Sequence, residues 1–509
     1  MIRRVPTTSK PALLVVCFAP ARAGSEAAHA RLGTLWRGCR ALGMTGALPG
    51  AAVGPELPPG PYADSGFRLV ATACRPLGGG EVYVAFVFVE HDVLGLVAML
   101  APNADGGTLA DGWTALGEQW RSAVPDPTTP SNEELGEVLL YQALFRRGRE
   151  TTAGRLDAAV RAALPVAPGS LRAGHDRTRD GFYLWEAADT DAVAVHRTLA
   201  VLAPDTAERA LDRWVWATAG HSGLMPFARY LLHAAKVRHA ARVHRASAAA
   251  DELVASSDEA VRSVLTAVRP QDAGWAPSLP DLSRAQQRLD ADRLLPTGLL
   301  WRITRLRQLR RNVDTALENM RRHVPEVRRY GEGPTLFARD SGAAQALARQ
   351  VDGDLVHLEA ARERADAARA VVAEAVDRAV REHRERITLI QTSVLSAVVT
   401  ALTTVQAFTY RLPVPAALQT CLVALSAALA FALPLVLLRW IGGVPAGAPY
   451  RWVDALAGGA LGATATWTAV TLAARLAGYG VAPPGVSVPA ALGVAAGVWV
   501  VTWRRGRTG

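Results

Sequence analysis

ALLVVCF at Ala12–Phe18 and SEAAHARLGTLWRGCRAL at Ser25–Leu42 set the fold of the N-terminal part of this chain. The first stretch is short and wholly apolar, which is typical of a β-strand buried on both faces. The second stretch places Leu32, Leu35 and Trp36 on one side of a helix. The sequence therefore predicts a buried strand that leads into an amphipathic helix.

More strands are expected downstream of this pair. Segments rich in β-branched and aromatic residues follow, and Gly78–Gly80 between the first two indicates a hairpin. Ser131–Glu134 has the spacing of a capping box and predicts a helix through Phe145. We predict an α+β domain over residues 11–225, after a tail at residues 1–10. Its later strands are expected at Phe67–Cys74, Glu81–Glu90, Val93–Leu100, Gly181–Trp185 and Thr198–Leu202.

Three of the expected strands end in Ala-Pro, and each is followed by a helix-like stretch that contains tryptophan. The dipeptides are Ala19–Pro20, Ala101–Pro102 and Ala203–Pro204. Proline fits just past a strand or in the first turn of a helix, where its missing N–H costs little. The pattern suggests repeated strand–helix units of the ferredoxin-like kind, with chance as the alternative because alanine and proline are abundant.

The character of the sequence changes over residues 226–386, where strand signals stop and Ala, Arg, Glu and Leu dominate. Apolar residues recur there in steps of three and four, which is the a/d pattern of coiled-coil helices. We predict a helical, coiled-coil region through which the chain could form a homo-oligomer. The series are Leu306, Leu309, Val313, Leu317, Met320 and Val324, then Leu347, Val351, Leu355 and Leu358.

Long uncharged runs follow, and they predict a transmembrane helix bundle over residues 387–503. About 20 residues are needed to cross ~30 Å of hydrocarbon as a helix, and the mean hydropathy of the chain is positive, +0.12. Glycine pairs at Gly-x-x-x-Gly spacing would let these helices pack closely. The four spans are expected at 387–410, 412–438, 455–474 and 486–503, with packing glycines Gly458, Gly462, Gly493 and Gly497.

Arginines at the ends of these runs predict the orientation. Positive charge favours the cytoplasmic side, so the soluble region, both termini and a basic tail at 504–509 are expected there. The protein would then be a multi-pass cell-membrane protein with the lipid bilayer as a partner. The N-terminal apolar run also resembles a signal peptide, but export would contradict this orientation, so we predict a strand. The arginines expected at the inner leaflet are Arg381, Arg384, Arg386, Arg439, Arg451, Arg504 and Arg505.

The net charge of +10 arises almost wholly from arginine, since Lys10 and Lys236 are the only lysines. Arginine and alanine are both abundant in proteins from GC-rich genomes, so the charge is weak evidence for nucleic-acid binding and we do not expect it. The four cysteines lie far apart without zinc-ligand spacing. They predict buried free thiols rather than disulfides, at Cys17, Cys39, Cys74 and Cys421.

Motifs that carry chemistry are scarce. The sequence has no P-loop, no His-Glu-x-x-His, no Gly-x-Ser-x-Gly and no Cys-x-x-Cys. Glu90, His91 and Asp92 end a strand and could hold a proton-transfer or metal site, although a polar turn explains them as well. We expect no catalytic residue, cofactor or metal. A pH-responsive patch or a solvated basic helix would account for His221, His233, His239 and His244.

The stretch LLVVCFAPARAGSEAAHARLGTLWRGCRALGMT resembles the start of proteins from bacterial CATRA conflict systems, a name that stands for caspase and tetratricopeptide-repeat associated. The matching features are Phe18-Ala19-Pro20, Leu35-Trp36, Cys39-Arg40 and Leu42-Gly43-Met44, and they cover under a tenth of the chain. The resemblance implies a defence or self-killing role beside a caspase-like peptidase and repeat proteins. It offers no catalytic motif to carry over.

Three functions are therefore in competition. The first is a non-enzymatic, membrane-anchored component of a conflict or signalling system, whose cytosolic domain docks a caspase-like peptidase or a repeat protein. The second is a channel or transporter with a cytosolic regulatory domain, although the Tyr410–Pro413 loop lacks the Gly-Met-Asn sequence of CorA-type magnesium channels. The third is an enzyme with an unrecognised site, for which no motif speaks.

Overall fold

A computed structural model describes most of the chain as two compact units, which we treat separately. Unit 1 takes Met1–Leu253 and Leu300–Glu359, and unit 2 takes Val254–Leu299 and Ala360–Gly509. The domain boundaries expected from the sequence stay predictions. The described residues are 8–21, 24–60, 62, 65–76, 80–103, 107–125, 133–148, 151–167, 169–188, 193–216, 223–247, 250–268, 279–294, 298–410, 416–442, 451–479 and 488–497.

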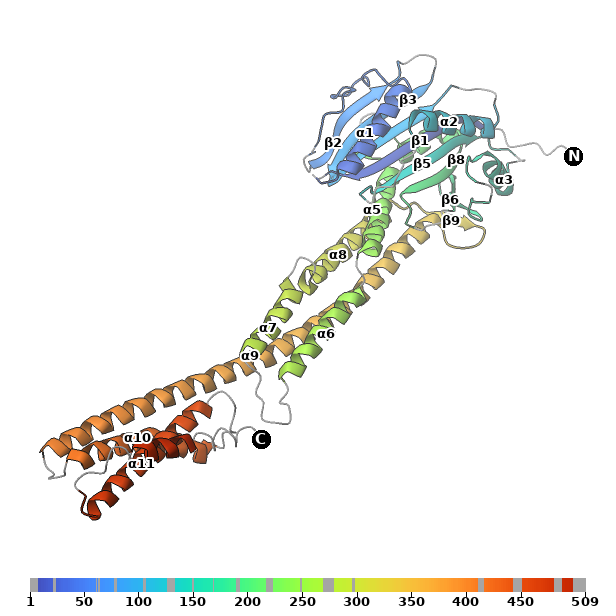
Figure 1. Ribbon diagram of the computed structural model, residues 1–509. Coiled ribbons are helices and arrows are strands. Elements are labelled where there is room, and N and C mark those ends of the chain that lie inside the picture. Colours follow the sequence, from blue (N-terminus) through green and yellow to red (C-terminus); the bar gives the residue numbers. More distant parts are fainter. Residues whose placement is uncertain are drawn as a thin grey trace. The chain divides into compact units, whose positions relative to one another are not determined.

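A nine-stranded sheet forms the centre of unit 1 (Figure 1). Its strand order is β2-β3-β4-β1-β5-β8-β7-β6-β9. Every neighbouring pair is antiparallel except β5 and β8, which are parallel. The strands are β1 (Thr8–Pro20), β2 (Ser65–Cys74), β3 (Val82–His91), β4 (Val93–Ala101), β5 (Gly136–Phe145), β6 (His175–Thr178), β7 (Tyr183–Glu186), β8 (His196–Pro204) and β9 (Val327–Tyr330).

The opening apolar stretch is the middle of β1, as predicted. β1 lies between β4 and β5, and its residues Ala12–Ala19 are buried. A strand covered on both faces needs an unbroken apolar run, and the sequence shows one. The β2–β3 hairpin and the third strand β4 are confirmed as well.

Helices cover both faces of this sheet. Leu13, Val15 and Cys17 pack into one core with residues of α1 (Glu26–Ala41), α2 (Leu109–Ala123) and α3 (Ala153–Ala163). The alternate residues of β1 point to the opposite face, where α5 packs against β1 and β5. Unit 1 also contains η1 (Asp205–Ala207), α4 (Glu208–Val215), α5 (Pro226–Ala246), most of α8 (Leu299–His323) and the first turns of α9 (Leu336–Tyr410).

Two predictions about the sheet are wrong. The helix expected from Ser131–Glu134 through Phe145 is the strand β5, because the run after Gly136 is buried between β1 and β8 and this burial outweighs a local capping signal. The first two of the capping residues lie outside the described part of the chain. The ferredoxin-like duplication also fails, since β1 pairs antiparallel with β4 whereas β5 pairs parallel with β8. Each Ala-Pro strand is nevertheless followed by a helix, as expected.

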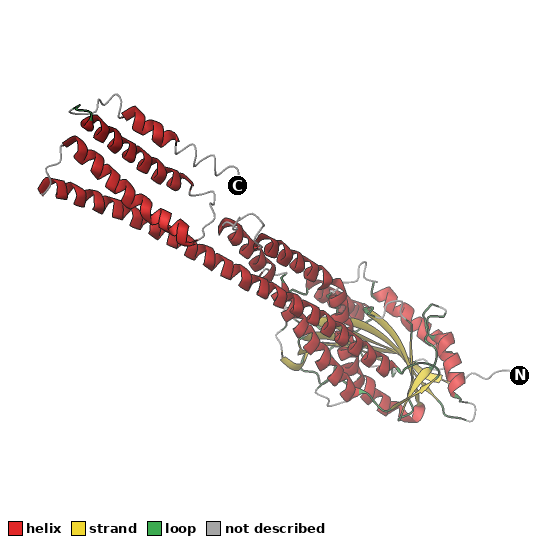
Figure 2. Ribbon diagram, turned by 90° about the horizontal axis from the view of Figure 1, so that it is seen from below, coloured by secondary structure: helices red, strands yellow, loops and turns green. Residues whose placement is uncertain are grey.

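Unit 2 is helical where the structure describes it (Figure 2). Its core lies among α6, α7 and α9 and contains Val264, Leu289 and Val372. Ion pairs support the same three helices: Arg364 binds Asp258 at 2.9 Å. The helices are α6 (Ala250–Val268), α7 (Leu279–Leu294), the remainder of α9, α10 (Ala416–Gly442) and α11 (Arg451–Leu476).

The predicted membrane spans are not supported. Across the described ranges, no helix combines the length and the apolar character that crossing a membrane requires. An uncharged run is not the same as an apolar run: 387–410 carries many Thr and Ser residues, and 455–474 many Gly and Thr. Only 488–497 of the fourth run is described as helix, which is shorter than the ~20 residues a span needs. Residues 412–415 of the second run lie outside the described part of the chain.

This finding corrects the prediction of a multi-pass cell-membrane protein with a transmembrane bundle. The expected bilayer partner and the expected cytoplasmic orientation depended on that bundle and lose their support. The roles assigned to the four packing glycines and seven flanking arginines depended on those spans and stay predictions. Among them, Arg381 and Arg384 are exposed on α9, and Arg504 and Arg505 lie outside the described residues. The four cysteines are buried free thiols, as predicted.

Candidate functional site

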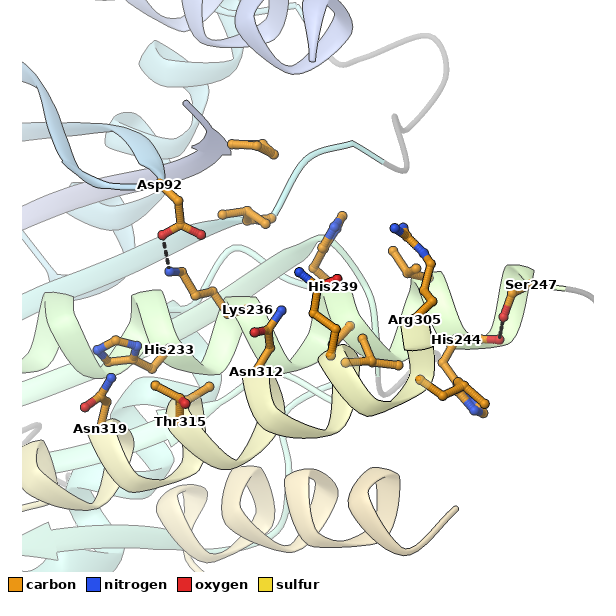
Figure 3. A pocket seen from close by; sticks show the side chains of 18 of the residues that line it. Asp92, His233, Lys236, His239, His244, Ser247, Arg305, Asn312, Thr315 and Asn319 are labelled. Atoms are coloured by element: carbon orange, nitrogen blue, oxygen red, sulfur yellow. Dashed lines mark hydrogen bonds and ion pairs between the residues drawn. The ribbon is translucent and has the colours of Figure 1, made fainter. Parts of the chain in front are cut away.

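A polar cavity of about 370 Å³ lies in unit 1 between α5 and α8, next to the ends of β1 and β4 (Figure 3). One face of α5 lines it with His233, Lys236 and His244. Spacings of three and four residues bring polar side chains of α8 to the opposite wall. Those α8 residues are Arg302, Arg305, Gln308, Asn312, Thr315 and Asn319.

The two groups of candidate residues found in the sequence meet at this cavity. Lys236 Nζ donates a hydrogen bond to Asp92 Oδ1 at 2.6 Å. Burial opposes ionisation of Asp92, but the hydrogen bond and charge of Lys236 hold its pKa below the usual value. Glu90 forms a longer ion pair with Arg229, at 3.4 Å. Asp92 and Glu90 therefore connect the β3–β4 turn to α5.

His91 is the last residue of β3, directly before the turn, and has a positive φ of 54°. A left-handed backbone is uncommon for a residue with a side chain and fits a tight connection between two strands. Within the described chain, no group of His, Cys, Asp and Glu side chains could hold a metal ion. The polar-turn interpretation of Glu90, His91 and Asp92 is the one that the geometry favours.

His233 is neutral at physiological pH. Burial, together with the nearby charges of Lys236, His323 and Arg229, lowers its pKa to about 4. Its Nδ1 atom is buried and has no hydrogen-bond partner among the described residues. The ring stacks on that of His323, with centroids 6.4 Å apart. His233 thus offers an unused polar atom beside a lysine.

The other histidines of the basic stretch differ in their surroundings. His244 is buried, and its Nε2 lies 2.9 Å from Asp354 Oδ2. His239 also lines the cavity. His221 lies outside the described residues. Three of the four predicted histidines therefore face the same cavity.

The arginines of α8 bring positive charge into the cavity. Arg302 is only 7% exposed, and its Nη2 donates a hydrogen bond to the Ser247 hydroxyl at 2.7 Å. Burial lowers the pKa of Arg302, partly offset by Asp354. Arg305 lies over the ring of Trp301, 5.6 Å from its centroid. The lining thus presents cations that a bound anion would stabilise.

A buried ion cluster lies elsewhere in unit 1, where β7 and β8 meet α5 and α9. Arg197 donates to Glu186 at 2.6 Å and to both oxygens of Asp340, at 2.9 and 3.3 Å. Asp340 also accepts hydrogen bonds from the Tyr230 hydroxyl at 2.7 Å and from Arg238 at 3.2 Å. The cluster fixes the first turns of α9 against the sheet.

Electrostatics explain why these charges persist in the interior. Burial disfavours the charge on Arg197, but Asp340 and Glu186 outweigh it and raise its pKa. Burial also opposes ionisation of Asp340. The charges of Arg197 and Arg238 outweigh this effect, so the pKa of Asp340 is lowered. Sequence reasoning missed this cluster, since Arg197 and Asp340 are 143 residues apart in the chain. The available signal was a pair of charges, Glu186 and Arg197, within apolar strands.

Comparison with protein families identifies two segments of the chain, and the second of them extends from unit 1 into unit 2. Residues 12–219 match the family model described as CASPASE and TPR Repeat-Associated N-terminal domain. Residues 225–365 match the model described as CASPASE and TPR Repeat-Associated C-terminal domain. No curated protein and no solved structure matches the chain.

The two matched segments share one sheet. β9 belongs to the second segment and pairs with β6 of the first, from His175 opposite Tyr330 to Thr178 opposite Val327. Asp176 of the first segment accepts a hydrogen bond from the Leu336 backbone N–H at 2.6 Å, which caps the start of α9. The ion cluster and the cavity also take residues from both segments.

Proposed function

Since the chain belongs to the caspase and TPR repeat-associated (CATRA) family, we propose that it is a non-enzymatic, protein-binding component of a conflict system. Unit 1 would recognise the partner, which is a caspase-like peptidase or a TPR-repeat protein. The family models cover residues 12–219 and 225–365, so we assign the association that the family name describes to this part of the chain.

One observation supports this proposal most strongly: the parts of the two matched segments that lie in unit 1 form a single body. A shared sheet, the Asp176 cap and the buried Arg197–Asp340 pair hold them in one geometry. A rigid surface that needs no ordering on contact loses less free energy when it binds a partner. A joint body built from both domains therefore suits recognition of a protein.

Co-expression of the full chain with the caspase-like peptidase and the TPR protein of the same locus tests the proposal. We expect a stoichiometric complex with one of them in size-exclusion chromatography. If the chain elutes separately from both proteins, the proposal is contradicted. The chain by itself should not cleave either partner, and proteolysis by the purified chain would contradict the non-enzymatic assignment.

The recognition surface can be located by chemical cross-linking. Amine-reactive reagents would report little, because Lys10 and Lys236 are the only lysines. A carboxyl-reactive reagent is better suited, since exposed acids occur in both units. We expect partner cross-links at unit 1 acids such as Glu118 and none at the exposed unit 2 acid Glu374. Cross-links confined to unit 2 would overturn the assignment of recognition to unit 1.

A further inference from the structure

We propose that the outer edge of β9 binds an extended, acidic segment of the partner protein as a further strand of the sheet. This inference rests on the function proposed above, because it states how unit 1 would hold its partner. Three features of β9 and its neighbour β6 support it: open backbone groups, a pair of arginines without a counter-charge, and a fixed position in the sheet.

The two outer strands of the sheet, β2 and β9, differ in how their edges are covered (Figure 1). At β2, the Thr72 N–H donates a hydrogen bond to the Gly54 carbonyl at 2.9 Å. Cys74 exchanges two further hydrogen bonds with Gly46, both of 2.9 Å. No described segment covers β9 in this way. A strand edge with unpaired N–H and C=O groups is a template on which another strand can pair.

The register of β9 shows which of its backbone groups are open. The Arg179 N–H, just past β6, donates to the Glu326 carbonyl at 2.9 Å, so the backbone of Glu326 faces β6. Directions alternate along a strand, so Arg328 also faces β6, whereas Val327 and Arg329 face outward. The N–H and C=O groups of these two residues form no hydrogen bond with any residue that the structure describes. Both residues can therefore pair with an added strand.

Two arginines determine the charge of the strand that fits. Arg328 on β9 is exposed and lies directly opposite Arg177 on β6. Like charges in opposite positions destabilise a sheet. Arg177 lies over the Tyr183 ring, but neither arginine has a carboxylate partner among the described residues. An Asp or Glu side chain on a strand beside β9 would lie next to Arg328 and supply the missing negative charge.

The same arginines argue against a second copy of this chain at the β9 edge. Antiparallel pairing of two β9 strands centred on Arg328 would place the two Arg328 side chains opposite each other. An acidic segment of a different protein is therefore the occupant that the charges favour. Tyr330 is 38% exposed and lies on the same face of β9 as Arg328. It offers a surface to an apolar side chain two residues from the acidic one.

β9 is held in its extended form by unit 1 itself. Arg329 Nη1 donates to Asp176 Oδ1 at 3.0 Å, and the side chain of Asp176 is only 1% exposed. The Tyr330 ring stacks on that of His175, with centroids 5.4 Å apart. An edge that is already ordered loses little conformational freedom when a strand is added. In strand addition, main-chain hydrogen bonds provide affinity and alternate side chains provide specificity.

Fluorescence anisotropy with labelled peptides tests the proposal on the full chain. The probes are overlapping 12-residue peptides from the caspase-like peptidase and the TPR protein of the same locus, and the synthetic peptides TVEVDVT and TVKVRVT. We expect at least one acidic peptide to bind with a Kd below 1 mM. It should bind at least tenfold more tightly than TVKVRVT and than its own form with alternate prolines, such as TPEPDPT, which keeps the charge but cannot pair as a strand. Failure of either expectation would overturn the proposal.

Paired variants locate the binding at β9. Val327→Pro removes an outward N–H that β6 does not use, so it should weaken the tightest peptide at least tenfold and leave circular dichroism unchanged. Arg328→Glu tests the charge without a backbone change and should also weaken it at least tenfold. Arg68→Glu is the matched control, because Arg68 is exposed on the other outer strand, β2. We expect less than a twofold change from this control, and equal weakening by all three variants would overturn the site.

The same variants separate this inference from the function proposed above. A complex with the peptidase or the TPR protein that keeps its affinity in both Val327→Pro and Arg328→Glu would overturn the role of β9 and leave the partner assignment intact. Absence of a complex with either protein would overturn the partner assignment, whereas the synthetic peptides still report on β9.

Discussion

Replacing Asp340 by alanine should destabilise unit 1 more than any exposed ion-pair deletion. The side chains of Asp340 and Arg197 are only 7% and 5% exposed. The cluster holds Arg197, Arg238 and Arg339 against two carboxylates, those of Asp340 and Glu186. Removing one carboxylate leaves three buried or half-buried cations facing one. Breaking such a pair costs about 3–5 kcal/mol, which is a large share of the free energy of unfolding of a typical protein.

Asp352→Ala is the matched control for this prediction. It lies on the same helix and binds Arg310 at 2.8 Å, but its side chain is 52% exposed. Exposed pairs contribute about 0–1 kcal/mol. The two variants thus remove the same chemical group from the same helix and differ in burial.

Urea denaturation followed by circular dichroism and tryptophan fluorescence measures the two free energies of unfolding. If Asp340→Ala does not fold, Tyr230→Phe provides a milder test. It removes the hydroxyl that donates to Asp340 at 2.7 Å and should cost about 1.5–3 kcal/mol, as for a hydrogen bond to a charged group. An Asp340→Ala effect within about 1 kcal/mol of the Asp352→Ala effect would refute the reasoning.

Two further predictions concern titration and packing. Because the pKa of His233 is about 4 in the folded chain and near 6.5 when unfolded, the unfolded chain takes up the proton first as pH falls. Stability should therefore fall between about pH 6.5 and 4, by at most ~3 kcal/mol from this group. His233→Gln should reduce this dependence of stability on pH. A pKa near 6.5 for the His233 imidazole, measured by NMR titration of the folded chain, would contradict the prediction. A Cβ at Gly38 would collide with Val124, so Gly38→Ala should cost about 1–3 kcal/mol. Gly33→Ala on the same helix meets open space and should stabilise by up to about 1 kcal/mol, and equal shifts in Tm would contradict the packing.

The sequence predicts local structure well wherever one physical signal dominates. Ala12–Phe18 is apolar throughout and is the centre of a doubly covered strand. Leu306, Val313 and Met320 recur at helical spacing and are buried along α8. Gly136–Phe145 failed because the capping signal before it is local, whereas its burial between two other strands is a property of the tertiary fold.

The candidate site could be predicted only in part for a related reason. Asp92 and His233 were both identified as candidates, but nothing in the sequence shows that they line the same cavity. The Asp92–Lys236 ion pair that connects these two parts of the chain joins residues 144 positions apart. Arg302 was not identified as a candidate, because the helix that carries it was predicted from its apolar residues alone. The membrane prediction treated the absence of charge as apolarity, although 387–410 carries many Thr and Ser residues and 455–474 many Gly and Thr residues.

Hydrogen exchange of the full chain, measured by mass spectrometry at increasing urea, tests most directly whether the two CATRA segments form one body. Amides of β8 in the first segment and of α5 in the second should open with the same free energy and the same urea dependence. β9 should lose protection together with β6, its partner in the sheet. Exchange of α5 and the first turns of α9 at low urea, while β8 stays protected, would show two independent domains and contradict the account.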